Sequence, residues 1–163
     1  MHDTIWAPWR LSYITTSKEQ PPAGCFLCRY AADPAHDAEN LVISRGKRTF
    51  TVLNRFPYNN GHLLVSPLEH KAHLEDLDDE ELLECMHSLQ ELIQKIRERM
   101  SAEGFNVGVN LGRIAGAGVP GHLHWHLVPR WTGDTNFMPV LAGVDVIPQS
   151  LEALRQVLIG PQT

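Results

Sequence analysis

Residues 122–128 read HLHWHLV, and this stretch decides which fold the chain can adopt. Histidine occupies every second position, at His122, His124 and His126, and Trp125 and two leucines fill the positions between and after them. Successive side chains of a β-strand point to opposite faces, so the spacing predicts three imidazoles on one face and an apolar core face on the other. Half-buried structural histidines and a metal site remain alternatives, although three imidazoles from one strand diverge too far to share one zinc ion easily.

A glycine-rich segment precedes this strand. Asn110 is followed by Gly112, Gly116, Gly118 and Gly121. So permissive a backbone can bring N–H groups close to an anion, although a long hairpin loop is also rich in glycine. A neutral imidazole can attack phosphorus without prior deprotonation. The combination favours a nucleophilic histidine beside a bound phosphate.

The rest of the sheet is predicted from short runs with β-like composition. The expected strands are Leu41–Ser44, Thr49–Leu53, His62–Ser66, Phe105–Leu111 and His122–Pro129. Turn residues separate the first three, and most connections are short or hairpin-like, which favours antiparallel pairing. The fold class is therefore α+β: a five-stranded antiparallel sheet with one long helix across it. Residues Ser150–Ile159 are expected to form one further helix.

The long helix lies between the third and fourth predicted strands. Asp78 and Glu81 resemble a capping pair at its start, and Gly104 is placed to stop it. Apolar residues recur along it at spacings of three and four, which predicts one buried stripe. The stripe residues are Leu82, Met86, Leu89, Ile93, Ile96 and Met100.

Length and composition limit the classes of protein that this chain can represent. It has 163 residues, 43% hydrophobic and 20% charged, which is typical of one globular domain. The formal net charge of −5 argues against broad binding to nucleic acid or to an anionic membrane. No apolar run approaches the ~20 residues of a membrane helix, and the start of the chain does not read as a secretory signal. Three cysteines cannot form a fully paired disulfide framework, so we expect a cytoplasmic protein.

Cys25 and Cys28 form a C-x-x-C pair that has three interpretations. A redox dithiol usually opens a helix after a strand, whereas this pair follows Pro-Pro-Ala-Gly in what reads as an irregular arm. Two buried cysteines without chemistry are the second interpretation. A metal knuckle is the third, and it needs two further ligands, for which histidine is the usual residue.

Two segments of the sequence resemble a known family. HLHWHLV matches the His-x-His-x-His-x-x signature of the histidine triad (HIT) proteins, and NRFPYNNGHLLVSPLEH at 54–70 is similar to the ribose-binding strand and turn of that family. The resemblance covers roughly residues 25–139 of a single 1–163 domain, with an N-terminal arm at 1–24 and a C-terminal extension at 140–163. WAPWR at 6–10, the CFLC pair and PRWTGDTNFMPV at 129–140 together resemble the bacterial diadenosine tetraphosphate phosphorylase (ATP adenylyltransferase) branch.

The resemblance implies a role for each matching residue. His124 is the expected nucleophile, His126 contacts the α-phosphate and helps to orient and protonate the leaving group, and His62 lies near the triad. Asn54 is expected to bind the ribose hydroxyls and Asn110 the phosphates.

The nucleotide-binding set is completed by residues around the glycine-rich segment. The glycine backbone at Gly116 and Gly118 is expected to hold phosphate, with Arg113 as a candidate cation and Trp131 as a candidate contact. Many family members carry Gly-Gln-Ser or Gly-Gln-Thr just before the triad, whereas this chain has GAGVPG at 116–121, without the hydroxyl. Handling of the leaving group is therefore expected to rely more on backbone amides.

Zinc-bearing members of the superfamily imply the two missing metal ligands. Their histidine positions correspond to His70 and His122 here, and His73 is a competing candidate for the first of these. The expected site, with Cys25 and Cys28, is structural and closed. We expect no organic cofactor.

The resulting functional hypothesis is nucleotidyl transfer at the α-phosphate of an adenine nucleotide through an adenylyl-histidine. Phosphorolysis of diadenosine tetraphosphate, with inorganic phosphate as the second substrate, is the preferred form. Alternatives are a dinucleoside polyphosphate hydrolase, a nucleotide phosphoramidase or a nucleotide-binding module without catalysis. The resemblance also implies a homodimer whose two sheets join side by side.

Overall fold

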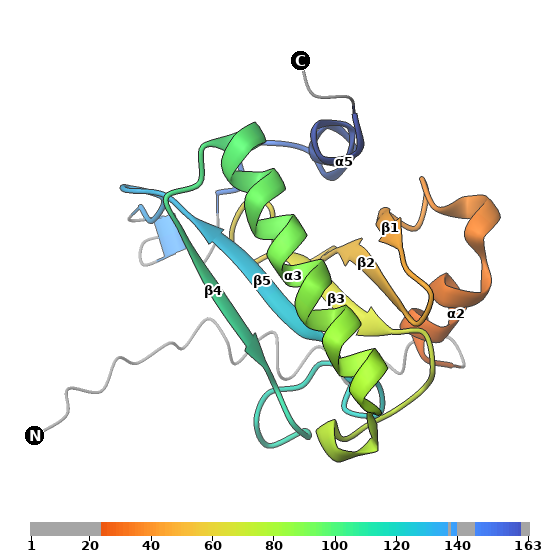
Figure 1. Ribbon diagram of the computed structural model, residues 1–163. Coiled ribbons are helices and arrows are strands. Elements are labelled where there is room, and N and C mark those ends of the chain that lie inside the picture. The colour runs from red at the N-terminus through yellow and green to blue at the C-terminus, as the bar shows by residue number, and fades with distance from the viewer. Residues whose placement is uncertain (1–23, 137, 140–145, 161–163) are drawn as a thin grey trace, which may run out of the picture.

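A computed structural model describes residues 24–136, 138–139 and 146–160, and its centre is a five-stranded antiparallel sheet of order β1-β2-β3-β5-β4 (Figure 1). This confirms the predicted α+β class. The strands are β1 (Val42–Arg45), β2 (Thr49–Leu53), β3 (Leu63–Pro67), β4 (Gly104–Val109) and β5 (Trp125–Arg130). WAPWR at 6–10 and most of the N-terminal arm lie outside the described residues.

The long helix α3 (Asp79–Met100) crosses one face of the sheet (Figure 1). The predicted capping pair is present: the Asp78 carboxylate accepts from the Glu81 N–H, and the Glu81 carboxylate accepts from the Asp78 N–H. The expected stop was wrong. The helix ends at Ser101, which adopts the left-handed conformation at φ 52°, and Gly104 instead opens β4.

The buried stripe of α3 is rotated from the predicted one. Leu89 and Ile96 are buried as expected, whereas Leu82 is 38% exposed and Leu92 is buried instead. The fully buried residues are Glu81, Cys85, Leu89, Leu92 and Ile96. Glu81 is buried because Lys71 forms an ion pair with its carboxylate, so the stripe includes a residue type that an apolar pattern does not count.

The start of β5 corrects the predicted strand. The ladder begins at Trp125, so His122 and His124 precede it. The Leu123 N–H donates to the Lys71 carbonyl, which holds this extended segment beside the chain that follows β3. The predicted alternation nevertheless holds, because Leu123, Trp125 and Leu127 all lie in the hydrophobic core.

Short helices complete the described structure. The helix α5 (Leu151–Ile159) confirms the C-terminal prediction, and two 3-10 turns, η1 (Pro34–His36) and η2 (Leu74–Asp76), lie in connections. The helix α2 (Phe26–Ala32) was not predicted: Cys25 is its N-cap residue, so the cysteine pair opens a helix rather than lying in an irregular arm. In the described residues, no helix is long and apolar enough to cross a membrane.

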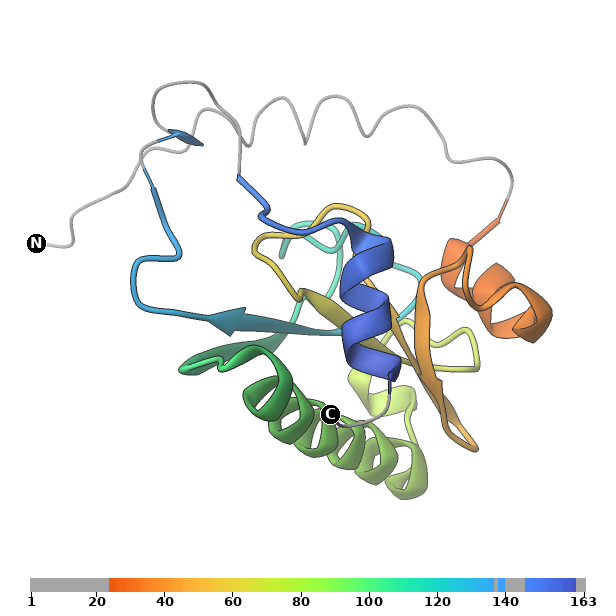
Figure 2. The same ribbon diagram turned by 90° about the horizontal axis from the view of Figure 1, so that it is seen from above.

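The two faces of the sheet carry different structures. Figure 2 shows α3 on one side, and the β2–β3 and β4–β5 connections rise on the other. Those two connections contain the residues around His62 and the glycine-rich segment. The histidine face of β5 therefore points away from α3, toward the loops.

Candidate active site and metal site

His124 lies directly before β5, and one hydrogen bond fixes the orientation of its ring. Its Nδ1–H donates to the His122 carbonyl over 2.8 Å, and a carbonyl can only accept. The proton therefore sits on Nδ1, and Nε2 carries a free lone pair. The side chain is 6% exposed, and this burial lowers the pKa of His124. The ring is thus neutral and nucleophilic near pH 7.

A second imidazole has the opposite tautomer because of a relay that starts at a backbone amide. The Tyr58 N–H donates to His62 Nδ1 over 3.0 Å, so the proton of His62 lies on Nε2. His62 Nε2 is 2.9 Å from His126 Nδ1, which must accept. The proton of His126 therefore lies on Nε2, which is buried and has no partner among the described residues.

Both relay rings are neutral. Burial, with smaller contributions from neighbouring imidazoles, lowers the pKa of His62 to about 3 and that of His126 to about 4. The centroids of the His124 and His126 rings are 5.0 Å apart. Two neighbouring imidazoles thus present a lone pair and an N–H donor, which suits attack on a phosphorus and stabilisation of the charge that then develops on oxygen.

The predicted nucleotide contacts separate into two groups. Asn54 lies against the relay: its Nδ2 is 3.3 Å from His62 Nδ1, and its Oδ1 accepts from the Phe56 N–H. Asn110 follows β4 directly, and its Nδ2 donates to the Gly116 carbonyl over 3.4 Å. Asn54 therefore joins the histidines, whereas Asn110 closes the glycine-rich loop.

The glycine-rich loop is internally bonded at its centre. The Gly116 N–H, at a φ of 90°, donates to the Arg113 carbonyl, so this amide is already used within a turn. The exposed Arg113 side chain and the Gly118 N–H make no hydrogen bond in the described part of the chain. Trp131 donates its indole N–H to the Met100 carbonyl and packs against the core.

Four predicted metal ligands come together at the start of α2. Their ligand atoms, from Cys25, Cys28, His70 and His122, all lie within 4.8 Å of one another. His122 Nδ1 is 3.3 Å from each sulfur, and His70 Nδ1 is 3.1 Å from Cys28 Sγ. Zinc bonded to sulfur and nitrogen at its usual lengths gives sulfur–nitrogen separations of roughly 3.5 Å, so the group fits a tetrahedral ion.

The surroundings of this cluster orient its ligands. His122 Nε2–H donates to the Pro67 carbonyl over 2.9 Å, which turns the Nδ1 lone pair toward both sulfurs. Gly121 leaves room for His70, because a Cβ at this position would lie 3.2 Å from His70 Nε2. His73, the competing ligand candidate, is instead the N-cap residue of η2.

Sequence comparison places this geometry in a family. The model of the HIT domain matches residues 35–133. The chain is 41% identical over 165 residues to the AP-4-A phosphorylase of Mycobacterium tuberculosis (strain ATCC 25618 / H37Rv), and the alignment covers 94% of this chain and 81% of that relative. The chain belongs to the HIT domain family.

Other HIT relatives agree in fold. The chain is 30% identical over 134 residues to the adenosine 5'-monophosphoramidase of Saccharomyces cerevisiae, covering 80% of this chain and 77% of the relative. A solved Zn-bound histidine triad family protein from Mycobacterium smegmatis superposes with a TM-score of 0.65 at 28% identity, over 83% of this chain and 93% of the other. The match of the HIT domain model begins at residue 35, after Cys25 and Cys28.

Three contributors to the HIT site were not found from sequence. They are the Tyr58 amide and the Pro67 and Lys71 carbonyls, all backbone groups. Backbone atoms leave no residue-type signal. The one available hint is the turn PYNNGH at 57–62, in which Gly61 adopts a φ of 78° just before His62.

Proposed function

We propose that this HIT protein is a nucleotidyl transferase that acts at the α-phosphate of diadenosine tetraphosphate and passes the adenylyl group to inorganic phosphate. The opposite tautomers of His124 and His126 carry the proposal. One side chain presents an unprotonated Nε2 and its neighbour a protonated Nε2 that has no partner among the described residues. The similarity to a relative named AP-4-A phosphorylase supports this substrate.

In the first step, the lone pair of His124 Nε2 forms a bond to the α-phosphorus while the bridging P–O bond breaks. The bridging oxygen keeps the electron pair and leaves as a phosphate oxygen of ATP. The ring of His124 becomes positively charged, and its Nδ1–H bond to the His122 carbonyl stabilises that charge.

His126 acts in this step as a hydrogen-bond donor rather than as an acid. A neutral imidazole does not give up its only proton near pH 7, and the pKa of about 4 keeps His126 neutral. The leaving phosphate needs no proton, because phosphate monoesters lose their second proton with a pKa of about 6. The Nε2–H therefore stabilises charge on the bridging oxygen, which differs from the leaving-group protonation that the family resemblance implies.

In the second step, an oxygen of inorganic phosphate attacks the α-phosphorus and the bond from phosphorus to His124 Nε2 breaks. The electron pair returns to Nε2, and the products are ADP and the free enzyme. The whole reaction converts diadenosine tetraphosphate and phosphate into ATP and ADP. Two displacements, each easier than the direct one, share the covalent intermediate.

The metal cluster suits a structural zinc ion, and its four side chains leave no open position for substrate. Bound there, zinc supplies a cross-link between α2, the segment after β3 and the triad segment. A reducing compartment keeps such cysteines as thiols, in keeping with the proposed cytoplasmic location. A homodimer joined through β4 is the second part of this proposal, because β4 has no further neighbouring strand at that edge of the sheet in the described part of the chain.

Product analysis tests the proposed acceptor. The protein is incubated with diadenosine tetraphosphate at increasing phosphate concentrations, and nucleotides are separated by chromatography. We expect a saturable rise in rate and products of ADP and ATP. Accumulation of AMP, with no effect of phosphate, would identify a hydrolase. If the protein does not convert the dinucleotide but releases AMP from an adenosine phosphoramidate, that result would favour the phosphoramidase activity named in the yeast relative.

Arg113 is proposed to help to hold the acceptor phosphate. Its side chain makes no ion pair within the described residues and is exposed next to the glycine-rich loop. Arg113→Ala should therefore raise the phosphate concentration needed for half-maximal rate by several-fold, with a smaller effect on the KM for the dinucleotide. An equal change in both constants would remove Arg113 from the acceptor site.

A further inference from the structure

A cavity of about 310 Å³ opens beside the relay, on the histidine face of the sheet. Side chains on one face of a strand recur every second residue, so Val128 and Arg130 follow His126 along the same face of β5. Both of them line the cavity, and Asn106, paired with Val128 across the β4–β5 ladder, lines it too. Tyr58 joins the two sites: it lines the cavity, and its ring stacks on His126 at 5.8 Å.

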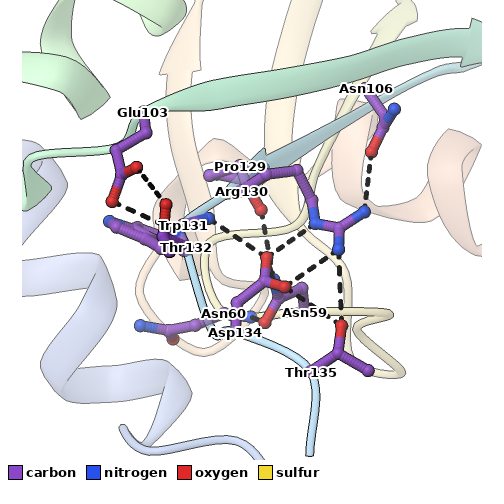
Figure 3. Close-up of polar contacts among 10 residues, drawn as sticks. All are labelled: Asn59, Asn60, Glu103, Asn106, Pro129, Arg130, Trp131, Thr132, Asp134 and Thr135. Atoms are coloured by element: carbon purple, nitrogen blue, oxygen red, sulfur yellow. Dashed lines mark hydrogen bonds and ion pairs between the residues drawn. The ribbon is translucent and has the colours of Figure 1, made fainter.

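The cation in the wall of this cavity is neutralised. Arg130 donates to both oxygens of Asp134, over 2.6 and 2.9 Å, and Asn59 and the Trp131 N–H also donate to Asp134 (Figure 3). These bonds hold the pKa of the Asp134 carboxyl well below its usual range. Among the described residues lining the cavity, no unpaired cation remains. A polyphosphate chain therefore finds little attraction here.

Two amide groups in the wall have a defined orientation. Arg130 Nη1 donates to Asn106 Oδ1 over 3.1 Å, so the Asn106 NH₂ group points away from it (Figure 3). Asn136 Oδ1 accepts from the Met138 N–H over 2.8 Å, so the NH₂ group of Asn136 remains available as a donor. Neither NH₂ group has a partner in the described part of the chain. Both are donors for ring nitrogens or hydroxyl oxygens of a ligand.

The remaining wall is apolar and partly aromatic. Val128, Pro139, Val146 and Ile147 line it together with the ring of Tyr58, which is 49% exposed. Flat apolar walls with a few fixed donors are typical of pockets for small organic ligands, and the volume lies at the lower end of their range. Aromatic rings stack on any nucleobase.

We propose that this cavity binds the nucleoside of the leaving nucleotide, the one that departs as part of ATP, through stacking on Tyr58 and hydrogen bonds from Asn106 and Asn136. The proposal rests on the proposed function, because it takes the bridging oxygen to lie at His126. The polyphosphate then begins at His126, and its distal nucleoside lies in the cavity farther along β5.

The transferred adenosine takes a different place. Asn54, Asn110 and the glycine-rich loop, the residues expected to hold the transferred nucleotide, do not line this cavity. The two nucleosides of the substrate are therefore recognised by separate sets of residues. A dinucleoside polyphosphate should bind more tightly than a mononucleoside polyphosphate of equal phosphate number.

Calorimetric titration of the His124→Ala protein tests the cavity without turnover. The ligands are diadenosine tetraphosphate and adenosine 5′-tetraphosphate, which differ by one nucleoside. We expect the dinucleotide to bind at least tenfold more tightly. Asn106→Ala and Asn136→Ala, each added to His124→Ala, should reduce that ratio to about twofold, in line with loss of one buried hydrogen bond. Gln90→Ala, on the exposed side of α3, is the matched control.

The outcomes separate this assignment from the proposed function. Equal affinity for the two ligands, or a ratio that survives both asparagine variants, would overturn the cavity assignment. Asn106 and Asn136 lie on separate segments, so misfolding of one variant leaves the other as the test. Wild-type protein that binds with the expected ratio but turns over neither ligand would remove the proposed chemistry and leave the cavity assignment in place.

Discussion

His124 and His126 are the same residue type two positions apart, and yet they present opposite chemistry. The difference comes from their Nδ1 partners. A carbonyl accepts from His124, and the Nε2–H of His62 donates to His126. Neither partner is itself reactive near pH 7. The backbone of the strand entrance and a turn 60 residues earlier thus decide which ring is nucleophile and which is donor.

Replacing the nucleophile should separate chemistry from binding. In His124→Ala we expect kcat to fall by roughly 10³-fold or more, because the covalent route is lost. Nucleotide affinity should stay within about tenfold, since Asn54 and the loops remain. Rapid quench with α-labelled substrate should trap an acid-labile adenylyl-protein in the wild type alone. Turnover near the wild-type rate in the variant would falsify the assignment.

The buried relay should make the protein sensitive to acid. The pKa of His62 is about 3 in the folded protein and near 6.5 when unfolded. Below pH 6.5, His62 binds a proton in the unfolded chain but not in the folded chain, so the free energy of unfolding falls as the pH falls. Well below pH 6.5, the free energy of unfolding falls by about 1.4 kcal/mol per pH unit. Between pH 7 and pH 5 the total decrease is about 2 kcal/mol, because the full slope is reached only below pH 6.5.

His62→Asn isolates that contribution. Urea unfolding at pH 7 and pH 5 should show a decrease in stability that is smaller by about 2 kcal/mol in the variant than in the wild type. Proton uptake by the metal ligands affects both proteins and cancels in the comparison. An identical decrease in both proteins would mean that His62 titrates normally in the folded state.

At the scale of single residues, the sequence predicted which side chains lie close together. It did not predict which ring nitrogens carry the protons. The alternation in HLHWHLV was enough to assign the core and histidine faces. The tautomers could not be predicted, because they depend on a backbone amide at Tyr58 and a carbonyl at His122. The role of Asp134 was likewise not visible, since one of its donors, Asn59, reaches it only when the 57–62 turn packs against the end of β5.

At the level of elements, the five strands and the helices α3 and α5 were predicted, whereas the short helix α2 was not. The predicted capping pair of α3 and the predicted C-terminal helix α5 both appear in the structure. The seven-residue α2 is too short to show helical periodicity, and its N-cap, Cys25, makes no side-chain capping bond. The structure ties this helix to the sheet through Cys25 and Cys28 beside two histidines. The element therefore depends on a long-range cluster that local sequence cannot show.

Loss of the metal should release α2. Elemental analysis of protein purified without added metal should find about one zinc per chain, and Cys28→Ser should retain almost none. The thermal midpoint of that variant should fall by several degrees, because metal bound only to the native state adds to its stability. Cys85→Ala, at the buried thiol in α3, is the control that loses packing but keeps zinc. A metal-free wild type of equal stability would contradict the zinc assignment.

Gly121→Ala tests the same cluster from the opposite side. The added methyl group would meet His70 Nε2 at 3.2 Å, so the ring must shift from a position in which its Nδ1 is 3.1 Å from Cys28 Sγ. We expect zinc affinity to fall about 10- to 100-fold, as measured by competition with a chelator, with the secondary structure unchanged. Unchanged affinity would show that His70 is free to relax or is not a ligand.

For the whole molecule, the two edges of the sheet differ. At the β1 edge, α5 packs alongside, and Arg155 donates to the Val42 carbonyl over 2.9 Å. The β4 edge has no such cover in the described residues (Figure 1). An uncovered edge strand is a template for pairing, and a two-fold axis through β4 would join two sheets into one.

That arrangement predicts a specific effect of charge on β4. Val107 is 48% exposed at the centre of this strand, where a two-fold related copy would pack against it. Val107→Glu would bury a carboxylate against its own symmetry mate, so we expect the variant to sediment as a monomer at concentrations at which the wild type is a dimer. Leu83→Glu, at a 56% exposed position on α3, is the matched control and should remain dimeric. A wild type that sediments as a monomer at all concentrations would contradict the dimer. A Val107→Glu protein that stays dimeric would place the interface elsewhere than β4.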